Sequence, residues 1–158
     1  MTIGVLKEGD NENRVVLLPE HVASLMKKDF QVQVEKGAGL SAFASDEQYT
    51  EAGATIRSRA EILKDADMLF SIHPFAETIQ KGKILISILG QLSNKPVVEK
   101  LAKEGVVSYS LDMIPRSTRA QAVDVLSSMA TVAGYKAVLV AAGAVHKFFT
   151  MLDRKSVV

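Results

Sequence analysis

Short apolar runs alternate with helix-like patterns along most of the chain. Five runs have the length and the β-branched content of strands, and a sixth, shorter one lies at residues 55–56. The five are residues 3–6, 31–35, 68–72, 84–89 and 106–110. Helices are predicted between them at 19–28, 46–52, 58–65 and 94–103, with a short turn at 75–80. This alternation predicts an α/β, Rossmann-like fold: a mostly parallel sheet of about five or six strands with helices on both faces.

The pattern changes towards the C-terminal end of the sequence. From about Arg119 it is nearly all helical, with Gly134 as a candidate break. Residues 129–145 are apolar apart from Lys136. This segment is shorter than the roughly 20 residues of a membrane span, and Lys136 places a charge near its middle. We therefore expect a long buried helix without direct membrane insertion. Because it is apolar almost all round, it needs cover from a partner or from a further domain.

Composition narrows the function classes. Hydrophobic residues make up 47% and charged residues 23%, which is typical of a globular domain. The formal net charge of +1 gives no reason to expect nucleic acid as a partner. The chain has no cysteine, no two histidines at metal-ligand spacing, and neither an HExxH nor a GxSxG motif, so we expect no metal site. The first residues lack the apolar core of a signal peptide, so we expect a soluble, intracellular protein.

Residues 37–42, GAGLSA, formally match the dinucleotide pattern G-x-G-x-x-A. A true fingerprint opens a helix and is followed, about 20 residues on, by an acidic residue that closes the next strand. Here no apolar helix face begins until after Asp46, and the next strand is followed by Arg57 and Arg59. We interpret these glycines as turn residues that permit positive φ.

Two polar segments follow strands at the edge where ligands bind in α/β folds. Lys7, Glu8, Glu12 and Arg14 come after the first strand, and His73 follows the strand at 68–72. The planar fork of Arg14 suits a carboxylate or a phosphate. These residues are candidates for a substrate-binding crevice, and a solvated connection is the alternative that the sequence leaves open.

Residues 115–128, PRSTRAQAVDVLSS, offer the most specific polar set in the chain. Arg116, Gln121, Asp124 and Ser127 supply a cation, an amide, a carboxylate and a hydroxyl. The last three stand three apart, so in a helix they would share one face. The alternative is a helix cap formed by Ser117 or Thr118, which would leave Asp124 and Ser127 merely exposed.

A family resemblance covers residues 3–151. The motifs IGVLKE-x5-NRVVLLPE, VEKGAGL-x5-SDEQYTEAGA, ADMLF and ISILG, and above all MIPRSTRAQAVDVLSSMATVAGYKAVLVAA, resemble the N-terminal half of domain I, in the α subunit, of proton-translocating NAD(P) transhydrogenases. Alanine dehydrogenase belongs to the same family and shares the fold.

The resemblance implies hydride transfer between NAD(H) on domain I and NADP(H) on a partner domain, coupled to proton passage through a membrane domain. It makes residues 115–124 a nicotinamide-facing loop, with Arg116, Gln121 and Asp124 as the catalytic set and Gln121, Asp124 and Ser127 as cofactor ligands. Hydride transfer needs no protein acid or base, only a well-oriented ring.

The resemblance also implies a domain plan and partners. Residues 1–128 would form the Rossmann-like domain, 129–150 a helix leading to a second, NAD-binding Rossmann domain absent here, and 151–158 an atypical tail. We therefore expect weak or no NAD(H) binding by this chain alone. The expected partners are that missing domain, the NADP-binding domain, the membrane domain and a second copy. The expected location is the cytoplasm or the mitochondrial matrix, peripheral to the membrane.

Two alternatives remain. Alanine dehydrogenases carry an arginine at the position of Arg14 for the substrate carboxylate, and this chain keeps it. Alanine dehydrogenases also carry a lysine and a histidine at positions that His73 and Gly90 fill in this chain. The acid/base groups for imine chemistry are therefore missing, and the transhydrogenase resemblance is preferred. The other alternative is a truncated, non-catalytic module for interaction or assembly.

Overall fold

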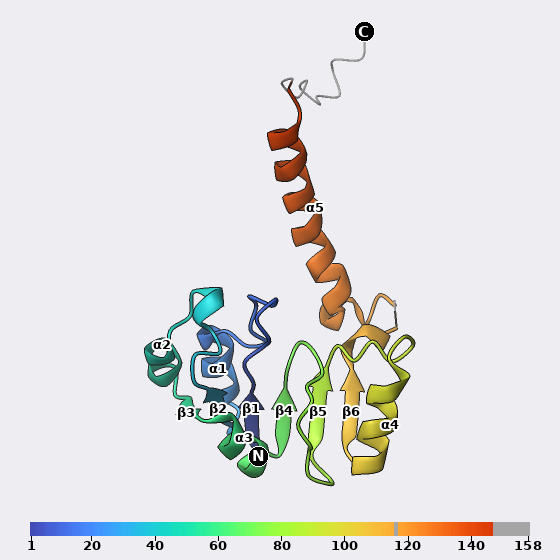
Figure 1. The fold of residues 1–158 in the computed structure, drawn as a ribbon. Helices are drawn as coiled ribbons and strands as arrows, with labels where there is room; N and C mark the ends of the chain where they lie inside the picture. The colour runs from blue at the N-terminus through green and yellow to red at the C-terminus, as the bar shows by residue number, and fades with distance from the viewer. Residues whose placement is uncertain (116, 147–158) are drawn as a thin grey trace. The chain divides into compact units, whose positions relative to one another are not determined.

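The computed structural model describes residues 1–115 and 117–146; Arg116 and residues 147–158 lie outside the described part. The chain divides into two compact units, Met1–Met113 and Ile114–Val158. The first unit holds the sheet and four α-helices, and the second holds one long helix (Figure 1). The boundaries expected at residues 128 and 150 concern domains of a larger protein and stay a prediction.

The first unit is built on a six-stranded parallel sheet. Its strands are β1 (Thr2–Val5), β2 (Gln31–Glu35), β3 (Thr55–Arg57), β4 (Met68–Phe70), β5 (Ile84–Ser87) and β6 (Val107–Ser110). Their order is β3-β2-β1-β4-β5-β6, and every neighbouring pair is parallel. The predicted α/β sheet is confirmed, including the short strand after residue 54. The order reverses direction between β1 and β4, which is where ligands bind in open α/β sheets.

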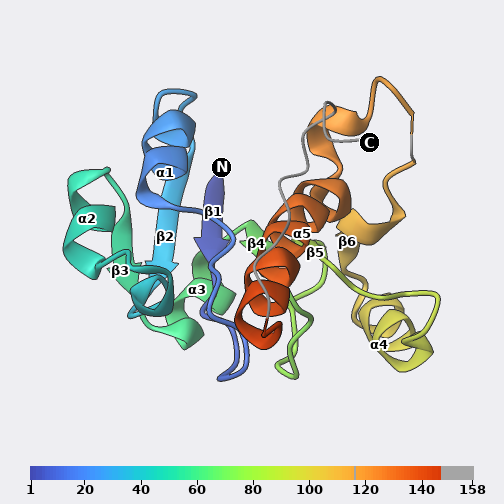
Figure 2. The ribbon, with the colours of Figure 1, turned by 90° about the horizontal axis from the view of Figure 1, so that it is seen from above.

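Helices cover both faces of this sheet. They are α1 (Pro19–Met26), α2 (Asp46–Glu51), α3 (Arg59–Asp65) and α4 (Lys95–Glu104). Val22 of α1 and Tyr49 of α2 pack in one buried cluster with Val5 and Val34. The helices α3 and α4 share a second cluster with Leu69 and Leu85. Figure 2 shows α1 on one side of the strands and α3 and α4 on the other.

Local sequence chemistry sets several helix starts. Ser45 and Ser58 each accept a backbone N–H three residues on, and Gln48 and Glu61 reach back to the cap, so α2 and α3 both begin with a capping box. Proline stands in the first turn of α1 and α4, where its missing N–H costs no helical bond. These are the signals from which the sequence predicts the helices.

The turn predicted at residues 75–80 is wrong, because the structure has only a bend at 76–77 and no hydrogen-bonded turn or helix there. The Lys100 ammonium donates to the carbonyl oxygens of Ala76 and Glu77 at 2.6 and 2.7 Å. Those carbonyls are therefore bonded to a side chain of α4 instead of to later N–H groups of their own segment.

The second unit contains a 3₁₀ turn, Gln121–Val123, and α5 (Val125–Ala144). α5 continues through Gly134 without a break, contrary to the expectation. None of its residues is buried. The buried helix expected from the sequence depends on a partner or a further domain and stays a prediction. Among the described residues, α5 is one helix whose length and composition would suit a membrane span.

Candidate functional site

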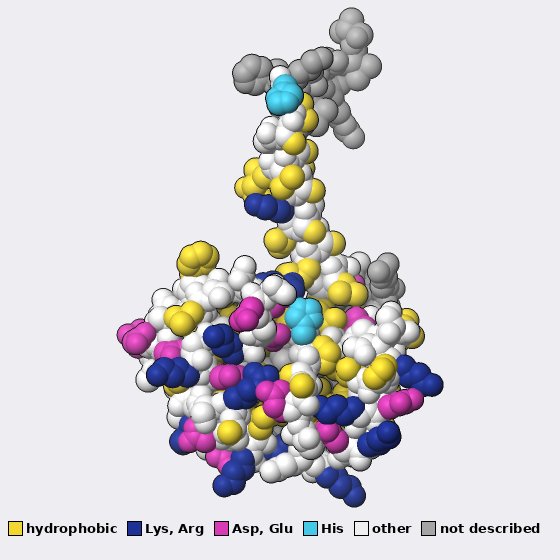
Figure 3. Space-filling model, in the orientation of Figure 1, with side chains coloured by type: hydrophobic (Ala, Val, Ile, Leu, Met, Phe, Trp, Pro, Cys, Tyr) yellow, Lys and Arg dark blue, Asp and Glu magenta, His cyan; other side chains and the backbone are white. Residues whose placement is uncertain are grey.

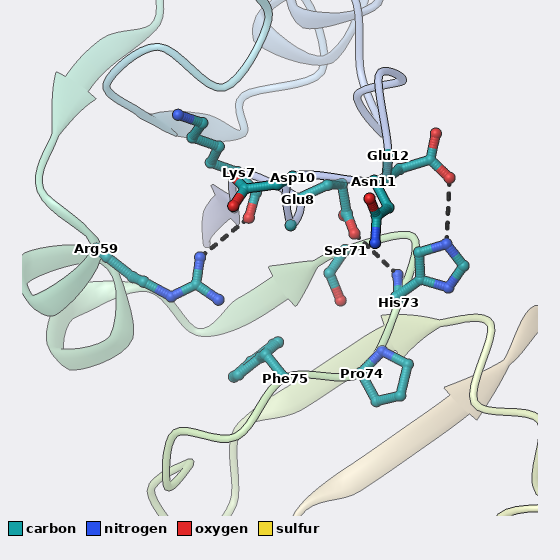
Figure 4. A pocket seen from close by; sticks show the side chains of 11 residues that line it. Lys7, Glu8, Asp10, Asn11, Glu12, Arg59, Ser71, His73, Pro74 and Phe75 are labelled. Atoms are coloured by element: carbon teal, nitrogen blue, oxygen red, sulfur yellow. Dashed lines mark hydrogen bonds and ion pairs between the residues drawn. The ribbon is translucent and has the colours of Figure 1, made fainter. Parts of the chain in front are cut away.

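A pocket of about 280 Å³ lies where the strand order reverses, at the carboxyl ends of β1 and β4 (Figure 4). It is formed by the loop after β1, the first residue of α3 and the loop after β4. The lining residues are Lys7, Glu8, Gly9, Asp10, Asn11, Glu12, Arg59, Ser71, His73, Pro74 and Phe75. The structure therefore has a pocket at the edge where the sequence predicts a crevice, and the binding of a ligand there stays a prediction.

Two carboxylates fasten the loop after β1 to the loop after β4. Glu8 accepts the backbone N–H groups of Ile72 and His73 at 2.5 and 3.1 Å. Glu12 accepts from Arg14 Nε at 2.8 Å and from its terminal nitrogen at 2.5 Å, and Glu12 Oε2 also lies 3.1 Å from His73 Nε2. Arg14 and His73, both predicted site residues, thus meet through Glu12.

This arrangement perturbs the charges at the pocket rim. The hydrogen bond from Arg14 is the main reason that the pKa of Glu12 falls from 4.5 to about 2, and the same bond raises the pKa of Arg14. Glu12 is nearly covered, whereas about half of each side chain of Arg14 and His73 is exposed. The guanidinium fork is therefore occupied by Glu12, and a carboxylate ligand would have to compete with it.

The opposite wall contains residues that the sequence analysis did not select. Arg59 donates to Glu35 at 2.9 Å and to Glu77 at 2.6 Å, and its guanidinium lies 5.3 Å from the centre of the Phe75 ring. Arg59 opens α3 directly after β3, so its position at the carboxyl edge of the sheet was a usable signal. Phe75 follows an irregular loop and left no comparable signal.

Residues 37–42 form a turn, and the interpretation of its glycines as positive-φ residues is confirmed for Gly37 and wrong for Gly39. Gly37 has φ +72° and donates its N–H to Asp46 Oδ1 at 2.8 Å. The element that follows is a three-residue 3₁₀ helix, Leu40–Ala42, which is too short to bind a pyrophosphate at its start. Gly39 has ordinary φ and is needed for space, since an added Cβ would lie 2.6 Å from Tyr49 Cε2.

In the second unit, Asp124 is the N-cap of α5. Its side chain accepts the N–H groups of Leu126 and Ser127, both at 3.1 Å, and Ser127 Oγ donates to Asp124 Oδ2 at 2.6 Å. The prediction that Gln121, Asp124 and Ser127 share one helix face is wrong, because the helix begins only after Asp124. The alternative cap at Ser117 or Thr118 is also wrong, since the cap is Asp124 itself.

These residues differ in exposure. Asp124 is 6% exposed, whereas the side chains of Gln121 and Ser127 lie at the surface. Gln121 begins the 3₁₀ turn just before the cap. Arg116, the cation of the predicted set, lies outside the described residues. In residues 1–115 and 117–146, no three His, Cys, Asp or Glu side chains are grouped as metal ligands.

Comparisons with known proteins match both the fold and the sequence. An NAD(P) transhydrogenase subunit alpha chain of Rhodospirillum rubrum is 39% identical over 163 residues, covering 96% of this chain and 42% of that protein. The alanine dehydrogenase of Staphylococcus saprophyticus is 32% identical, covering 94% of this chain and 41% of that one. The crystal structure of transhydrogenase from Sinorhizobium meliloti superposes with a TM-score of 0.88 at 33% identity, covering 93% of this chain and 46% of that chain.

The chain thus spans less than half the length of these relatives. The family model described as "Alanine dehydrogenase/PNT, N-terminal domain" matches residues 4–133, which include the pocket, the Gln121–Val123 turn and the capped start of α5. This chain therefore belongs to the alanine dehydrogenase/PNT N-terminal domain family, and within it is similar to transhydrogenase α subunits.

Proposed function

We propose that this chain is the portion of an NAD(P) transhydrogenase α subunit that positions the nicotinamide of NAD(H) for hydride transfer to NADP(H). The observation that carries the proposal is the cluster at the start of α5. It combines an exposed amide with a hydroxyl oriented by a buried carboxylate, on the segment whose sequence most resembles transhydrogenases.

The hydrogen bonds divide the roles between the three side chains. Ser127 Oγ donates its proton to Asp124, so its lone pairs are available to accept from a carboxamide NH₂ or a ribose hydroxyl. The Gln121 amide can both donate to and accept from a carboxamide. Asp124 acts mainly through Ser127 and the helix cap, as a positioning residue. The donor set therefore fits a nicotinamide.

The remaining components of the system are proposed with this role. The bound nicotinamide supplies the hydride chemistry, and the residues of this chain orient the ring. A second Rossmann domain holds most of the NAD(H), NADP(H) lies on a partner domain, and a membrane domain couples transfer to proton translocation. The chain itself would be peripheral to the membrane, in the cytoplasm or the mitochondrial matrix, and would bind NAD(H) weakly when alone.

An NMR titration of the ¹⁵N-labelled chain tests the positioning role directly. Reduced nicotinamide mononucleotide should shift the amide signals of Gln121 and Ser127 with a Kd of about 1 mM or weaker, and AMP should not. Gln121→Ala should reduce the shifts, and Thr118→Ala, on the same exposed segment, serves as the matched control. Equal shifts with AMP, or no shifts at about 10 mM ligand, would contradict the proposal and favour a non-catalytic assembly module.

A chimera tests hydride transfer itself. This chain would replace the matching segment of the Rhodospirillum rubrum subunit, and transfer would be followed spectrophotometrically. Asp124→Asn and Gln121→Ala should lower the transfer rate with only a modest loss of NADH affinity, because positioning rather than binding is lost. Asparagine still caps the helix, so a slower Asp124→Asn variant could not be attributed to an unfolded α5. Unchanged rates in both variants would remove the assigned roles.

Alanine dehydrogenase activity is the second candidate, because His73 lines the pocket and Arg14 is bonded to Glu12, which also lines it. We expect the chimera and the chain to show no oxidation of NADH with pyruvate and ammonium. Turnover that is lost on His73→Ala would reverse the preference.

A further inference from the structure

Ser71 gives the pocket at the ends of β1 and β4 a hydrogen-bond acceptor. It follows β4 directly, is 2% exposed and lines the pocket. Ser87 Oγ donates its one proton to the carbonyl oxygen of Ile72 at 3.1 Å. The proton between the two hydroxyls, which lie 3.3 Å apart, therefore belongs to Ser71 Oγ. The lone pairs of Ser71 remain available to accept a hydrogen bond from a ligand.

Arg59 gives the same pocket a donor. Its Nε donates to Glu77 at 2.6 Å, and its Nη1 donates to Glu35 at 2.9 Å. Within the described residues, Nη2 has no hydrogen-bond partner. Figure 4 shows Arg59, Ser71 and Phe75 around the same part of the pocket. One donor and one acceptor are thus available beside an aromatic ring.

The charges around the pocket select against ions. Figure 3 shows acidic side chains beside basic ones on this face of the first unit. The cations that line the pocket or pair with its lining are Lys7, Arg14 and Arg59, and the carboxylates are Glu8, Asp10, Glu12, Glu35 and Glu77. With His73 neutral, these three cations and five carboxylates give a formal net charge of −2, which disfavours an anion.

A cationic ligand is also disfavoured. It would meet the guanidinium of Arg59, whose free nitrogen is a donor. Two of the carboxylates, Glu8 and Glu12, already accept hydrogen bonds on both of their oxygens. A neutral ligand that both accepts and donates therefore matches the pocket best.

We propose that this pocket binds a small, neutral primary carboxamide with an apolar body. The carbonyl oxygen of the ligand accepts from Arg59 Nη2, and its NH₂ group donates to Ser71 Oγ. The apolar body contacts Phe75 and Pro74, which line the same pocket. A volume of about 280 Å³ lies just below the roughly 300–1,000 Å³ of pockets for drug-sized ligands, so the ligand is about the size of one aromatic ring and its amide.

This proposal does not rest on the nicotinamide role of Gln121, Asp124 and Ser127. Of the described residues that line the pocket, none belongs to that set. A free amide is favoured over the nicotinamide of a nucleotide, because the phosphate would add negative charge beside a rim that is already negative. The signals of Gln121 and Ser127 report the nicotinamide role in the same spectra, so failure of one proposal is distinguishable from failure of the other.

An NMR titration of the ¹⁵N-labelled chain with three molecules of one shape tests the class of ligand. Benzamide is neutral, benzoate is an anion and benzamidine is a cation at neutral pH. Benzamide should shift the amide signals of Ser71 and Phe75 with a Kd of about 1–10 mM, and the two ions should bind at least about fivefold more weakly. Reduced nicotinamide mononucleotide should shift these signals less than benzamide at equal concentration.

Three results of this titration would each overturn the proposal. The first is binding of benzoate or benzamidine as tight as that of benzamide. The second is larger shifts of Ser71 and Phe75 with the nucleotide than with benzamide. The third is the absence of shifts at about 10 mM benzamide, a concentration at which a ligand of the expected affinity occupies half or more of the sites.

A serine pair tests the acceptor. Ser71→Ala should weaken benzamide binding about fivefold, because the NH₂ group of the ligand loses its partner. The bond from Ser87 to Ile72 is unaffected by this change, and the ¹⁵N spectrum reports whether the variant is folded. Ser24→Ala, on the exposed surface of α1, is the control and should bind benzamide like the wild type.

An arginine pair tests the donor. Arg59→Lys keeps the positive charge but removes the guanidinium fork, and should weaken benzamide binding about fivefold. Arg57→Lys is the matched control, because Arg57 pairs with Glu61 and does not line the pocket. Wild-type affinity for benzamide in a folded Ser71→Ala or Arg59→Lys chain would overturn the proposal.

Discussion

Gly4→Ala is the sharpest test of how the sheet and α3 are packed. Gly4 lies in β1, the strand that leads into the pocket loop. A Cβ added to Gly4 would stand 2.3 Å from Ile62 Cγ2 and 2.9 Å from Ala66 Cβ. Both neighbours belong to the buried cluster under α3, and Ile62 is fully buried. The alanine methyl therefore has no space unless α3 shifts away from β1.

The cost follows from these contacts. Overpacking a well-packed core costs about 1–3 kcal/mol, and the reduced freedom of the unfolded alanine chain returns about 0.5–1 kcal/mol. A net loss of about 1–2 kcal/mol should lower the Tm of a chain of this length by about 2–8 °C.

A double-mutant cycle in urea identifies the cause. Ile62→Ala alone should cost about 2–5 kcal/mol, as a large-to-small change in a core. Because it also removes Cγ2, the double variant should be about 1 kcal/mol or more better than the sum of the singles. Gly9→Ala, whose added Cβ meets nothing within 4 Å, is the control and should change stability by less than about 0.5 kcal/mol. Additivity within about 0.5 kcal/mol would refute the steric account.

Three further predictions concern the pocket and α5. Because the folded-state pKa of Glu12 is lowered from 4.5 to about 2, its pairing stabilises the fold fully above pH 4.5, and this stabilisation is lost as the pH falls through 2. Glu12→Gln should remove about 1 kcal/mol of the pH dependence of the unfolding free energy, measured by urea titration. The same loss of stability at acid pH in the variant and the wild type would contradict this prediction. Lys100→Met should free the carbonyls of Ala76 and Glu77 and speed limited proteolysis between β4 and β5, whereas Lys95→Met, on the exposed first turn of α4, should not. Asp124→Ala should lower the free energy of unfolding by about 1 kcal/mol and reduce the helix content, whereas Asp124→Asn should leave both unchanged. An equal loss in the two variants would argue against the role of Asp124 as the N-cap.

The strands and the helices of the first unit could be predicted because their signals are local. Apolar runs, serine caps and proline in the first turn depend on neighbouring residues only. The pocket could be placed at the carboxyl edge from the alternation of strands and helices. The partners within it could not be predicted, since Glu12 joins Arg14 to His73 across 61 residues of sequence. Neither could Arg59 be matched with Glu77 and Phe75, because that requires the register of α3 against the loop after β4.

The start of α5 was mispredicted because one sequence pattern has two physical readings. A spacing of three from Gln121 to Asp124 to Ser127 fits a helix face, but an aspartate directly before an apolar helical run is also a preferred N-cap. The cap prevails because Asp124 then satisfies two N–H groups and the Ser127 hydroxyl together. Gly134 did not break the helix, since glycine costs only about 1 kcal/mol in a helix of 20 residues.

The N-cap residue Asp124 links the proposed cofactor site to the packing of α5 against other elements. Asp124 orients Ser127 only while the first turn of α5 is formed, because Ser127 reaches the carboxylate from that turn. Most helical stability in proteins comes from packing of an apolar face and not from intrinsic helix propensity. An element that packed against α5 would therefore also stabilise the turn that holds Ser127. Cover by a second copy or by a further domain would order this site without touching the cofactor.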